Sequence, residues 1–329
     1  MRRNALALIT ALALTAGTSS SALAQQYRIK FAHPAPTSDP AHRTAQLFAE
    51  KIAERTSKKV QVTIFPGGQL GKENEIIQGL QSGAIEMCFF SSTHLVNSVP
   101  EFGVLDLPYL VTDKEAIGRL LDGEIGKTIM AKLPAVGIRG LAYSESSFRN
   151  VFTKRPADSI EQLKGLKLRV PNSPVYVGTI RAMGALPTPI PFGELYTALQ
   201  QGIVDGAETS GSAFWNYKFY EVGKHWLVTK HTVNPGVYLV SEKFWQTLPP
   251  DVQKTIHETA VEAGLQHRNW SWEEDDKGLK NAQERGGVQV HVVNDLKPVA
   301  QKARALYSEF AQKIGQGLVD QAIAAFPSN

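Results

Sequence analysis

The sequence has almost no cysteine: Cys88 is the single one among 329 residues. An internal disulfide is therefore excluded, and the stability of the fold must come from the burial of apolar side chains, which a chain of this length can supply. Cys88 also lies in an apolar run, residues 85–90, which indicates a core position rather than a reactive thiol.

A concentration of charge of one sign is also missing. The chain has 35 Lys and Arg residues against 31 Asp and Glu residues, a formal net charge of +4, and no basic block interleaved with aromatic residues. Nucleic acid is therefore not expected as a partner.

Motifs for catalysis and for metal binding are missing as well. The eight histidines show no metal-ligand spacing; His225 and His231, for example, are six residues apart. No nucleophile elbow and no zinc-protease signature occur. The glycine-rich stretch 67–72 has one residue too few for a phosphate-binding loop, and Glu73 replaces the Ser or Thr that would hold magnesium. We expect no cofactor, no metal and no enzymatic activity.

Long apolar runs do not occur beyond the first two dozen residues. Arg2 and Arg3 precede an apolar stretch, residues 5–16, that is short for a membrane span, and the Ala-Leu-Ala sequence ending at Ala24 has the pattern of a signal-peptidase site. We predict cleavage after Ala24 and a soluble mature protein in the periplasm. An uncleaved membrane anchor is the alternative interpretation.

What the sequence does have is an alternation of strand-like and helical stretches. This alternation predicts an α/β fold with central sheets, and about 300 mature residues predict two domains joined by several ordered crossings. The expected strands are 27–32, 60–65, 85–90, 167–170, 186–190 and 204–208, and the expected helices are 41–56, 73–81, 175–183 and 194–201.

The clearest single element is a helix predicted over residues 251–284. The Pro-Pro-Asp sequence at 249–251 suits a helix start, and helix-compatible residues follow without a break. Gly264 and Gly278 fall inside this helix, where each is tolerable at a cost of about 1 kcal/mol. A helix of this length measures about 50 Å, longer than one small domain is wide, so we expect it to lie across both domains.

Several sequence blocks in the central region carry a resemblance to a known family. The blocks are residues 149–156 (RNVFTKRP), 163–171 (LKGLKLRVP), 183–192 (MGALPTPIPF), 194–202 (ELYTALQQG), 204–208 (VDGAE) and 218–222 (KFYEV), with 68–71 (GQLG) and 100–109 in the first half. In this order along the chain, the blocks resemble the solute-binding subunits of tripartite ATP-independent periplasmic (TRAP) transporters, a family that includes C4-dicarboxylate and sialic acid binders. The resemblance extends over essentially the whole mature chain.

The resemblance implies two α/β lobes that enclose a ligand cleft, with a long helix running behind both lobes. We place lobe 1 at residues 25–147 plus 233–272, and lobe 2 at residues 148–232 plus 273–329. The implied function is to bind a small organic carboxylate as the lobes close and to deliver it to the membrane subunits of the transporter. We expect a monomer. The alternatives are a periplasmic sensor module for a carboxylate and, from another class, a periplasmic hydrolase or isomerase.

Arg169 is the first candidate for ligand binding. In the resemblance it aligns with the family arginine that pairs with the ligand carboxylate. A guanidinium group is always charged, and its rigid fork matches a carboxylate with two parallel hydrogen bonds. Arg169 also lies at the end of a predicted strand, close to Pro171, where the clefts of α/β proteins open. A structural salt bridge is the alternative interpretation.

Four further candidates follow from the same resemblance. Arg149 aligns with a second arginine that contacts ligand in several members, and Phe192 aligns with an aromatic wall; their alternatives are a surface charge and a plain core residue. Thr209 stands where sialic acid binders and many relatives carry asparagine, and Ser91 replaces an acid that sialic acid binders use. Both replacements argue against sialic acid as the ligand.

Looser candidates are Glu145, Phe148 and Trp215, which flank the pocket motifs but could equally be packing or rim residues. His33, at the end of the first predicted strand, could reach the cleft or cap the following turn. The ligand class stays open between a carboxylate with an apolar or aromatic remainder and a dicarboxylate whose second carboxylate is held by the second arginine.

Overall fold

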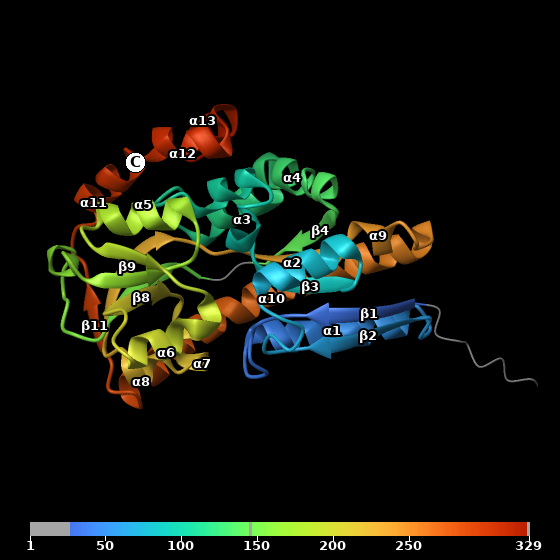
Figure 1. Cartoon of the computed structure of the whole chain (residues 1–329), viewed down its shortest axis with the longest axis horizontal. Coiled ribbons are helices and arrows are strands. Elements are labelled where there is room, and N and C mark those ends of the chain that lie inside the picture. The colour runs from blue at the N-terminus through green and yellow to red at the C-terminus, as the bar shows by residue number, and fades with distance from the viewer. Residues whose placement is uncertain (1–26, 145–146, 328–329) are drawn as a thin grey trace, which may run out of the picture.

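The computed structural model describes residues 27–144 and 147–327, and their strands form two sheets that stand side by side in Figure 1. The predicted α/β class is confirmed. The expected signal sequence with its cleavage site after Ala24 lies outside the described residues. Over the part of the chain that is described, no helix is both long and apolar enough to span a membrane.

The first sheet has the strand order β2 (Val60–Phe65), β1 (Tyr27–Ala32), β3 (Met87–Ser91), β10 (Gly236–Ser241) and β4 (Ile138–Tyr143). β1 runs parallel to β2 and β3, as crossover connections through a helix require. β10 lies antiparallel between β3 and β4, although it follows β4 by about 90 residues and β3 by about 145 residues in sequence. The chain therefore leaves the first sheet, builds the second, and returns.

The second sheet is formed by the middle of the chain and by one late strand. The strand order is β11 (Gln289–Val292), β9 (His225–Thr232), β5 (Arg149–Thr153), β8 (Gly206–Thr209), β6 (Lys167–Val170) and β7 (Leu186–Pro189). β6 runs parallel to β7 and β8, whereas β5 runs antiparallel to both β8 and β9.

Helices cover the faces of both sheets, and apolar clusters fill the space between the layers. The C-terminal helices α12 (Tyr307–Ile314) and α13 (Gln316–Ala325) pack on the side of the first sheet, where Phe310 joins Phe102 in one cluster. The lobe boundaries given above stay a prediction. The other helices discussed below are α1 (Pro40–Arg55), α2 (Glu73–Ser82), α3 (Lys114–Asp122), α5 (Pro174–Ala182), α6 (Leu195–Gln200), α7 (Gly211–Asn216) and α11 (Lys297–Arg304).

The predicted long helix is confirmed as α10 (Pro250–Glu284), 35 residues that run from one sheet to the other (Figure 1). The sequence predicted that its two internal glycines are merely tolerated in the helix. In the structure they are instead the positions where the helix backbone contacts neighbouring elements most closely. A Cβ atom on Gly264 would lie 2.6 Å from the carbonyl oxygen of Tyr143 in β4. A Cβ atom on Gly278 would lie 2.6 Å from the carbonyl oxygen of Gly211 in α7. Only glycine lets the helix backbone approach each sheet domain this closely.

Candidate functional site

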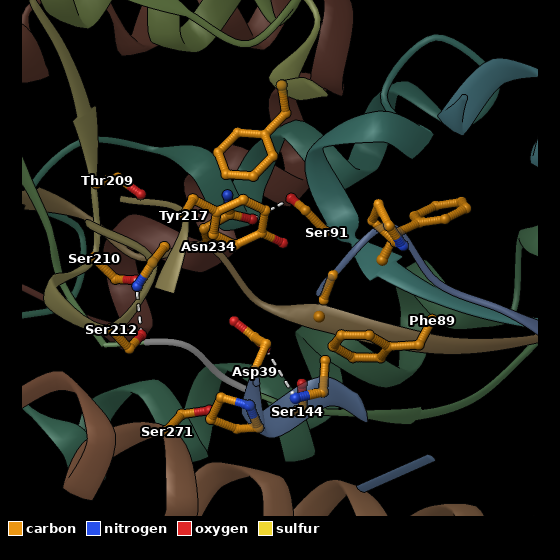
Figure 2. A pocket seen from close by; sticks show the side chains of 18 of the residues that line it. Asp39, Phe89, Ser91, Ser144, Thr209, Ser210, Ser212, Tyr217, Asn234 and Ser271 are labelled. Carbon is orange, nitrogen blue, oxygen red and sulfur yellow. Dashed lines mark hydrogen bonds between the residues drawn. The ribbon is translucent and has the colours of Figure 1, made fainter. Parts of the chain in front are cut away.

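A cavity of about 160 Å³ lies between the two sheets and against α10. Figure 2 shows that its side chains converge from several elements, including β3, β8, α7 and the N-terminus of α1. The long helix contributes His267 and Ser271. These residues follow Gly264 by three and seven positions, and Gly278 follows it by fourteen, so all four share one helical face. The contact face of α10 is therefore also one wall of the cavity.

Arg169 is the cation in this cavity with an unused donor. It lies on β6 and is 1% exposed. Its Nε donates to the carbonyl oxygen of Ile190 at 2.8 Å, and its guanidinium carbon lies 5.4 Å from the centre of the Phe192 ring. Its Nη1 is buried and has no hydrogen-bond partner among the described residues. A buried charged donor of this kind is costly unless a ligand supplies the acceptor.

The charge on Arg169 persists at neutral pH. Burial lowers the pKa of Arg169 to about 10; Glu208 acts in the opposite direction and Arg149 adds to the lowering. A guanidinium with a pKa near 10 still carries its full charge near pH 7. The cavity therefore presents a permanent cation to its contents.

Arg149, by contrast, is already paired. The antiparallel register of β5 and β8 brings it next to Glu208. Nε and Nη2 of Arg149 both donate to the Glu208 carboxylate, and Nη2 also donates to the Glu208 carbonyl oxygen at 2.7 Å. Burial would raise the pKa of Glu208, but Arg149 and the neighbouring His231 outweigh it and hold that pKa below its usual value. The pair is neutral as a unit, so Arg169 is the cation that remains uncompensated.

His94 and Glu73 lie on the opposite wall. Nε2 of His94 is 3.9 Å from Oε1 of Glu73. Burial lowers the pKa of His94; Glu73 opposes this effect, and the arginines Arg169 and Arg149 reinforce it. The imidazole is therefore neutral at pH 7 and can act as a hydrogen-bonding group.

Hydroxyl groups make up most of the remaining polar surface. The hydroxyl oxygens of Ser144 and Thr209 are buried without a hydrogen-bond partner in the described part of the chain. Those of Ser210 and Ser212 lie 3.1 Å apart, as the dashed line in Figure 2 shows. A hydroxyl both donates and accepts, so such a wall suits a ligand with several hydroxyl groups of its own. The lining hydroxyl residues are Ser91, Ser144, Thr209, Ser210, Ser212 and Ser271, and the lining aromatic residues are Phe89, Phe90, Phe192 and Tyr217.

Asp39 adds a second acid to the wall on the side of the first sheet. Its Oδ1 accepts a hydrogen bond from the backbone N–H of Ala41 at 2.9 Å and so caps α1. Burial raises the pKa of Asp39 to about 6, although the hydrogen bonds from Ala41 and Asn216 partly offset the rise. Because Asn216 ends α7 on the other side, this hydrogen bond joins the two sides of the cavity.

The structure brings five of the nine predicted site residues into one cavity. Arg169, Arg149, Thr209, Phe192 and Ser91 all line it, and they come from β6, β5, β8, the turn after β7 and β3. That these five residues touch a ligand stays a prediction.

Three of the other four predicted residues, His33, Phe148 and Trp215, are not among the described lining residues. His33 is buried, with its Nε2 3.1 Å from Nδ1 of His42. Phe148 packs edge-on against Trp272, with ring centres 6.0 Å apart, and Trp215 stacks on Tyr220 with ring centres 4.5 Å apart. Glu145 lies outside the described residues.

Sequence reasoning missed several lining residues. Asp39 and Glu73 stand at helix N-termini, where an acid is expected for capping alone. Asn234 follows β9, and Ser144 follows β4, two strands that the sequence analysis did not predict. A signal was available, because polar residues just past the ends of strands often face the cleft of an α/β protein.

Comparison with known proteins shows which family the chain with this cavity belongs to. Residues 31–313 match the family described as bacterial extracellular solute-binding protein, family 7. The chain belongs to this family. Family 7 proteins are periplasmic solute-binding proteins rather than enzymes, and the known proteins that resemble this chain include those of TRAP transporters. The hydrolase or isomerase alternative is therefore excluded.

Family 7 relatives of this chain bind different carboxylates. The chain is 33% identical over 312 residues to the C4-dicarboxylate-binding periplasmic protein DctP of Rhodobacter capsulatus, covering 94% of both chains. It is 34% identical to a TRAP periplasmic solute-binding protein from Bradyrhizobium solved with galacturonate, with a TM-score of 0.85 over 90% of this chain and 99% of that one. A third, from Sulfurospirillum deleyianum with bound succinate, is 31% identical, with a TM-score of 0.85 and coverage of 91% and 99%.

Proposed function

We propose that this family 7 protein binds a polyhydroxylated monocarboxylate, that is, a sugar acid, as the periplasmic solute-binding subunit of a TRAP transporter. The observation that carries the proposal is the buried Nη1 of Arg169, which has no hydrogen-bond partner among the described residues and belongs to a side chain that lines the same cavity as the serine and threonine hydroxyls. Export with cleavage after Ala24, a monomeric state, and delivery to the membrane subunits belong to the same proposal.

The carboxylate of the ligand accepts the hydrogen bond for which Nη1 of Arg169 has no partner among the described residues. A carboxylate there forms charge-assisted hydrogen bonds in a site that excludes most water, and such bonds are about twice as strong as neutral ones. The ring of Phe192 below the guanidinium keeps that group in place. The hydroxyls of the ligand then meet Ser144 and Thr209, whose own hydroxyls have no partner among the described residues.

A dicarboxylate fits this cavity less well. Its second carboxylate would need a second cation, and the charge of Arg149 is already neutralised by Glu208. The opposite wall carries Asp39 and Glu73, which repel an anion. These charges favour one carboxylate and several hydroxyls over two carboxylates.

A ligand panel tests the proposal. Mature protein is titrated by calorimetry with D-galacturonate, D-glucuronate, D-galactonate and succinate, and thermal unfolding is followed in parallel. At least one sugar acid should bind at least about tenfold more tightly than succinate. At a hundred times its dissociation constant, that ligand should stabilise the fold by about 2.7 kcal/mol. Tighter binding of succinate would overturn the sugar-acid assignment, and no binding of any carboxylate would overturn the transport function.

A further inference from the structure

A second cavity, of about 680 Å³, has none of its described lining residues in common with the first. We call it the α11 groove. Its walls are the segment after the short helix Pro100–Asp106, the residue that precedes β5, the end of β9, and one face of α11. Phe148, a predicted ligand residue, lies in this groove instead of in the cleft. The α11 groove lies where segments of both sheet domains meet.

The charge of the α11 groove is positive. Lys230, Lys297 and Arg304 line it, and no acid is found among the lining residues that the structure describes. None of the three forms an ion pair within the described residues. The nearby acids Asp113 and Asp295 do not line the groove, and each accepts a backbone N–H, from Ala116 at 2.8 Å and from Lys297 at 2.9 Å.

Two buried donors of the α11 groove residues lack acceptors. The hydroxyl of Tyr109 and the Nε of Arg304 have no hydrogen-bond partner among the described residues, and Tyr109 is only 6% exposed. Arg304 is fixed nearby, because its Nη2 donates to the carbonyl oxygen of Tyr109. A buried polar group without a partner costs roughly 1–3 kcal/mol. An acceptor from outside the chain would remove that cost.

The backbone of the α11 groove is strained at two lining residues. Tyr109 has φ = 57° and Lys230 has φ = 42°, which is the left-handed region that favours glycine. Such conformations persist where surrounding contacts hold them, and they concentrate at functional sites. Here the backbone N–H of Tyr109 donates to the carbonyl oxygen of His231 at 2.8 Å, so the two strained segments hold each other in place.

We propose that the α11 groove binds a small organic anion, a carboxylate or phosphate on an apolar body. The cations and unpaired donors recognise the anionic group, while Phe148, Val111 and Leu296 provide an apolar wall for the rest of the molecule. A volume of about 680 Å³ is in the range of small-molecule sites. The α11 groove is thus large enough to hold a small molecule.

Phenyl phosphate is used to probe binding in the α11 groove. Inorganic phosphate is the control, because it has the anionic group but lacks the apolar body. Both are titrated by calorimetry into wild-type protein and into Arg169→Ala, in which the cleft has lost its main anion contact. Phenyl phosphate should bind both proteins with equal affinity, at least about fivefold more tightly than inorganic phosphate.

Substitutions in the α11 groove then locate the binding. Lys230→Ala and Lys297→Ala change exposed side chains and keep the fold, and each should weaken phenyl phosphate binding about threefold to tenfold. Tyr109→Phe removes only the hydroxyl and should weaken it by a similar factor. Lys302→Ala, on the same helix but outside the groove, is the matched control and should change nothing.

Three outcomes would overturn the proposal. The first is no saturable binding of phenyl phosphate to the wild-type protein. The second is binding that disappears in Arg169→Ala but survives Lys297→Ala, which would place the probe in the cleft. The third is binding only of an acidic peptide from a membrane subunit and not of phenyl phosphate, which would make the α11 groove a protein interface.

Discussion

The two sides of the cleft carry opposite charges. The side of the second sheet supplies both arginines, Arg149 and Arg169, whereas the side of the first sheet supplies both acids, Asp39 and Glu73. The difference separates two tasks. One side captures a carboxylate, and the other side disfavours any additional negative charge on the ligand while it offers acceptors to hydroxyl groups. Specificity for a single carboxylate thus comes from the contrast between the sides rather than from either side alone.

The largest effect is expected when the ion pair between Arg149 and Glu208 is broken. Glu208→Gln leaves Arg149 buried without its counter-charge, so the free energy of unfolding should fall by about 3–5 kcal/mol. It also gives the second side a further uncompensated cation, and succinate should gain affinity relative to D-galacturonate. Urea unfolding at pH 7 and calorimetry measure the two effects. Arg149→Met combined with Glu208→Gln is the control and should recover most of the stability; a loss below about 1 kcal/mol in the single variant would contradict the prediction.

Removal of the uncompensated cation tests the same side more directly. Arg169→Ala should weaken binding of the best sugar acid by about 2–5 kcal/mol, or roughly 30-fold to several thousand-fold, because the ligand carboxylate is left buried and unpaired. Arg169→Lys should recover only part of the loss, since an ammonium group lacks the planar fork. Calorimetry with circular dichroism as a fold control measures this. Near-normal affinity in a folded Arg169→Ala protein would show that Arg169 does not hold the carboxylate.

The acids of the first side are tested through pH. Burial raises the pKa of Asp39 to about 6, so the Asp39 carboxyl group is more readily protonated in the folded protein than in the unfolded chain. The stability contribution of Asp39 is therefore full below its ordinary pKa near 4 and is lost as the pH rises through about 6. The neutral form also stops repelling anions, so succinate should bind roughly threefold to tenfold more tightly at pH 5 than at pH 7.

Asp39→Asn is the matched variant, because asparagine also caps a helix well. Calorimetry at the two pH values should show that this variant loses most of the difference, and the remainder comes from His94, which both proteins keep, and from the second carboxyl group of succinate, which titrates in the same range. An unchanged pH dependence in Asp39→Asn would mean that Asp39 does not set the charge of the first side.

The smallest effect is expected at the ion pair between Lys72 of the first side and Glu194 of the second, at 2.7 Å. Both side chains are exposed, and exposed pairs contribute little. Lys72→Ala should weaken ligand binding by less than about threefold, through less favourable closure, and the effect should disappear above about 0.5 M salt. A loss above tenfold would show that the pair does more than join the two sides.

Much of the fold follows from the sequence because its signals are local. Every predicted strand and helix is present within two residues of its expected bounds, and α10 is continuous. The strands that escaped prediction, β4, β5, β9, β10 and β11, include the antiparallel pairs that complete both sheets. Their partners lie far away in sequence, as with Val237 opposite Phe90, and no local pattern encodes such a pairing.

The site was predictable only in part, for the same reason. Arg169 could be predicted from its strand and its motif. The charge of Arg149, however, is compensated by Glu208, which is 59 residues away on a neighbouring strand. Trp215 lies on α7, and Tyr217 follows it by two residues, directly after the helix end, so the two side chains face different ways: Tyr217 lines the cleft, and Trp215 stacks on Tyr220. The sequence identifies the segment but not which of its faces meets the ligand.

The spacing of the two contact glycines in α10 also fixes how far one half of the protein is rotated relative to the other about the axis of this helix. Fourteen residues at about 100° each bring Gly278 back to within about 40° of Gly264 around the helix axis. Insertion of one residue between them would turn one half by about 100° relative to the other and lengthen the step by about 1.5 Å. The arginines would then no longer face the acids. We therefore expect that this helical segment does not tolerate the insertion or deletion of a single residue.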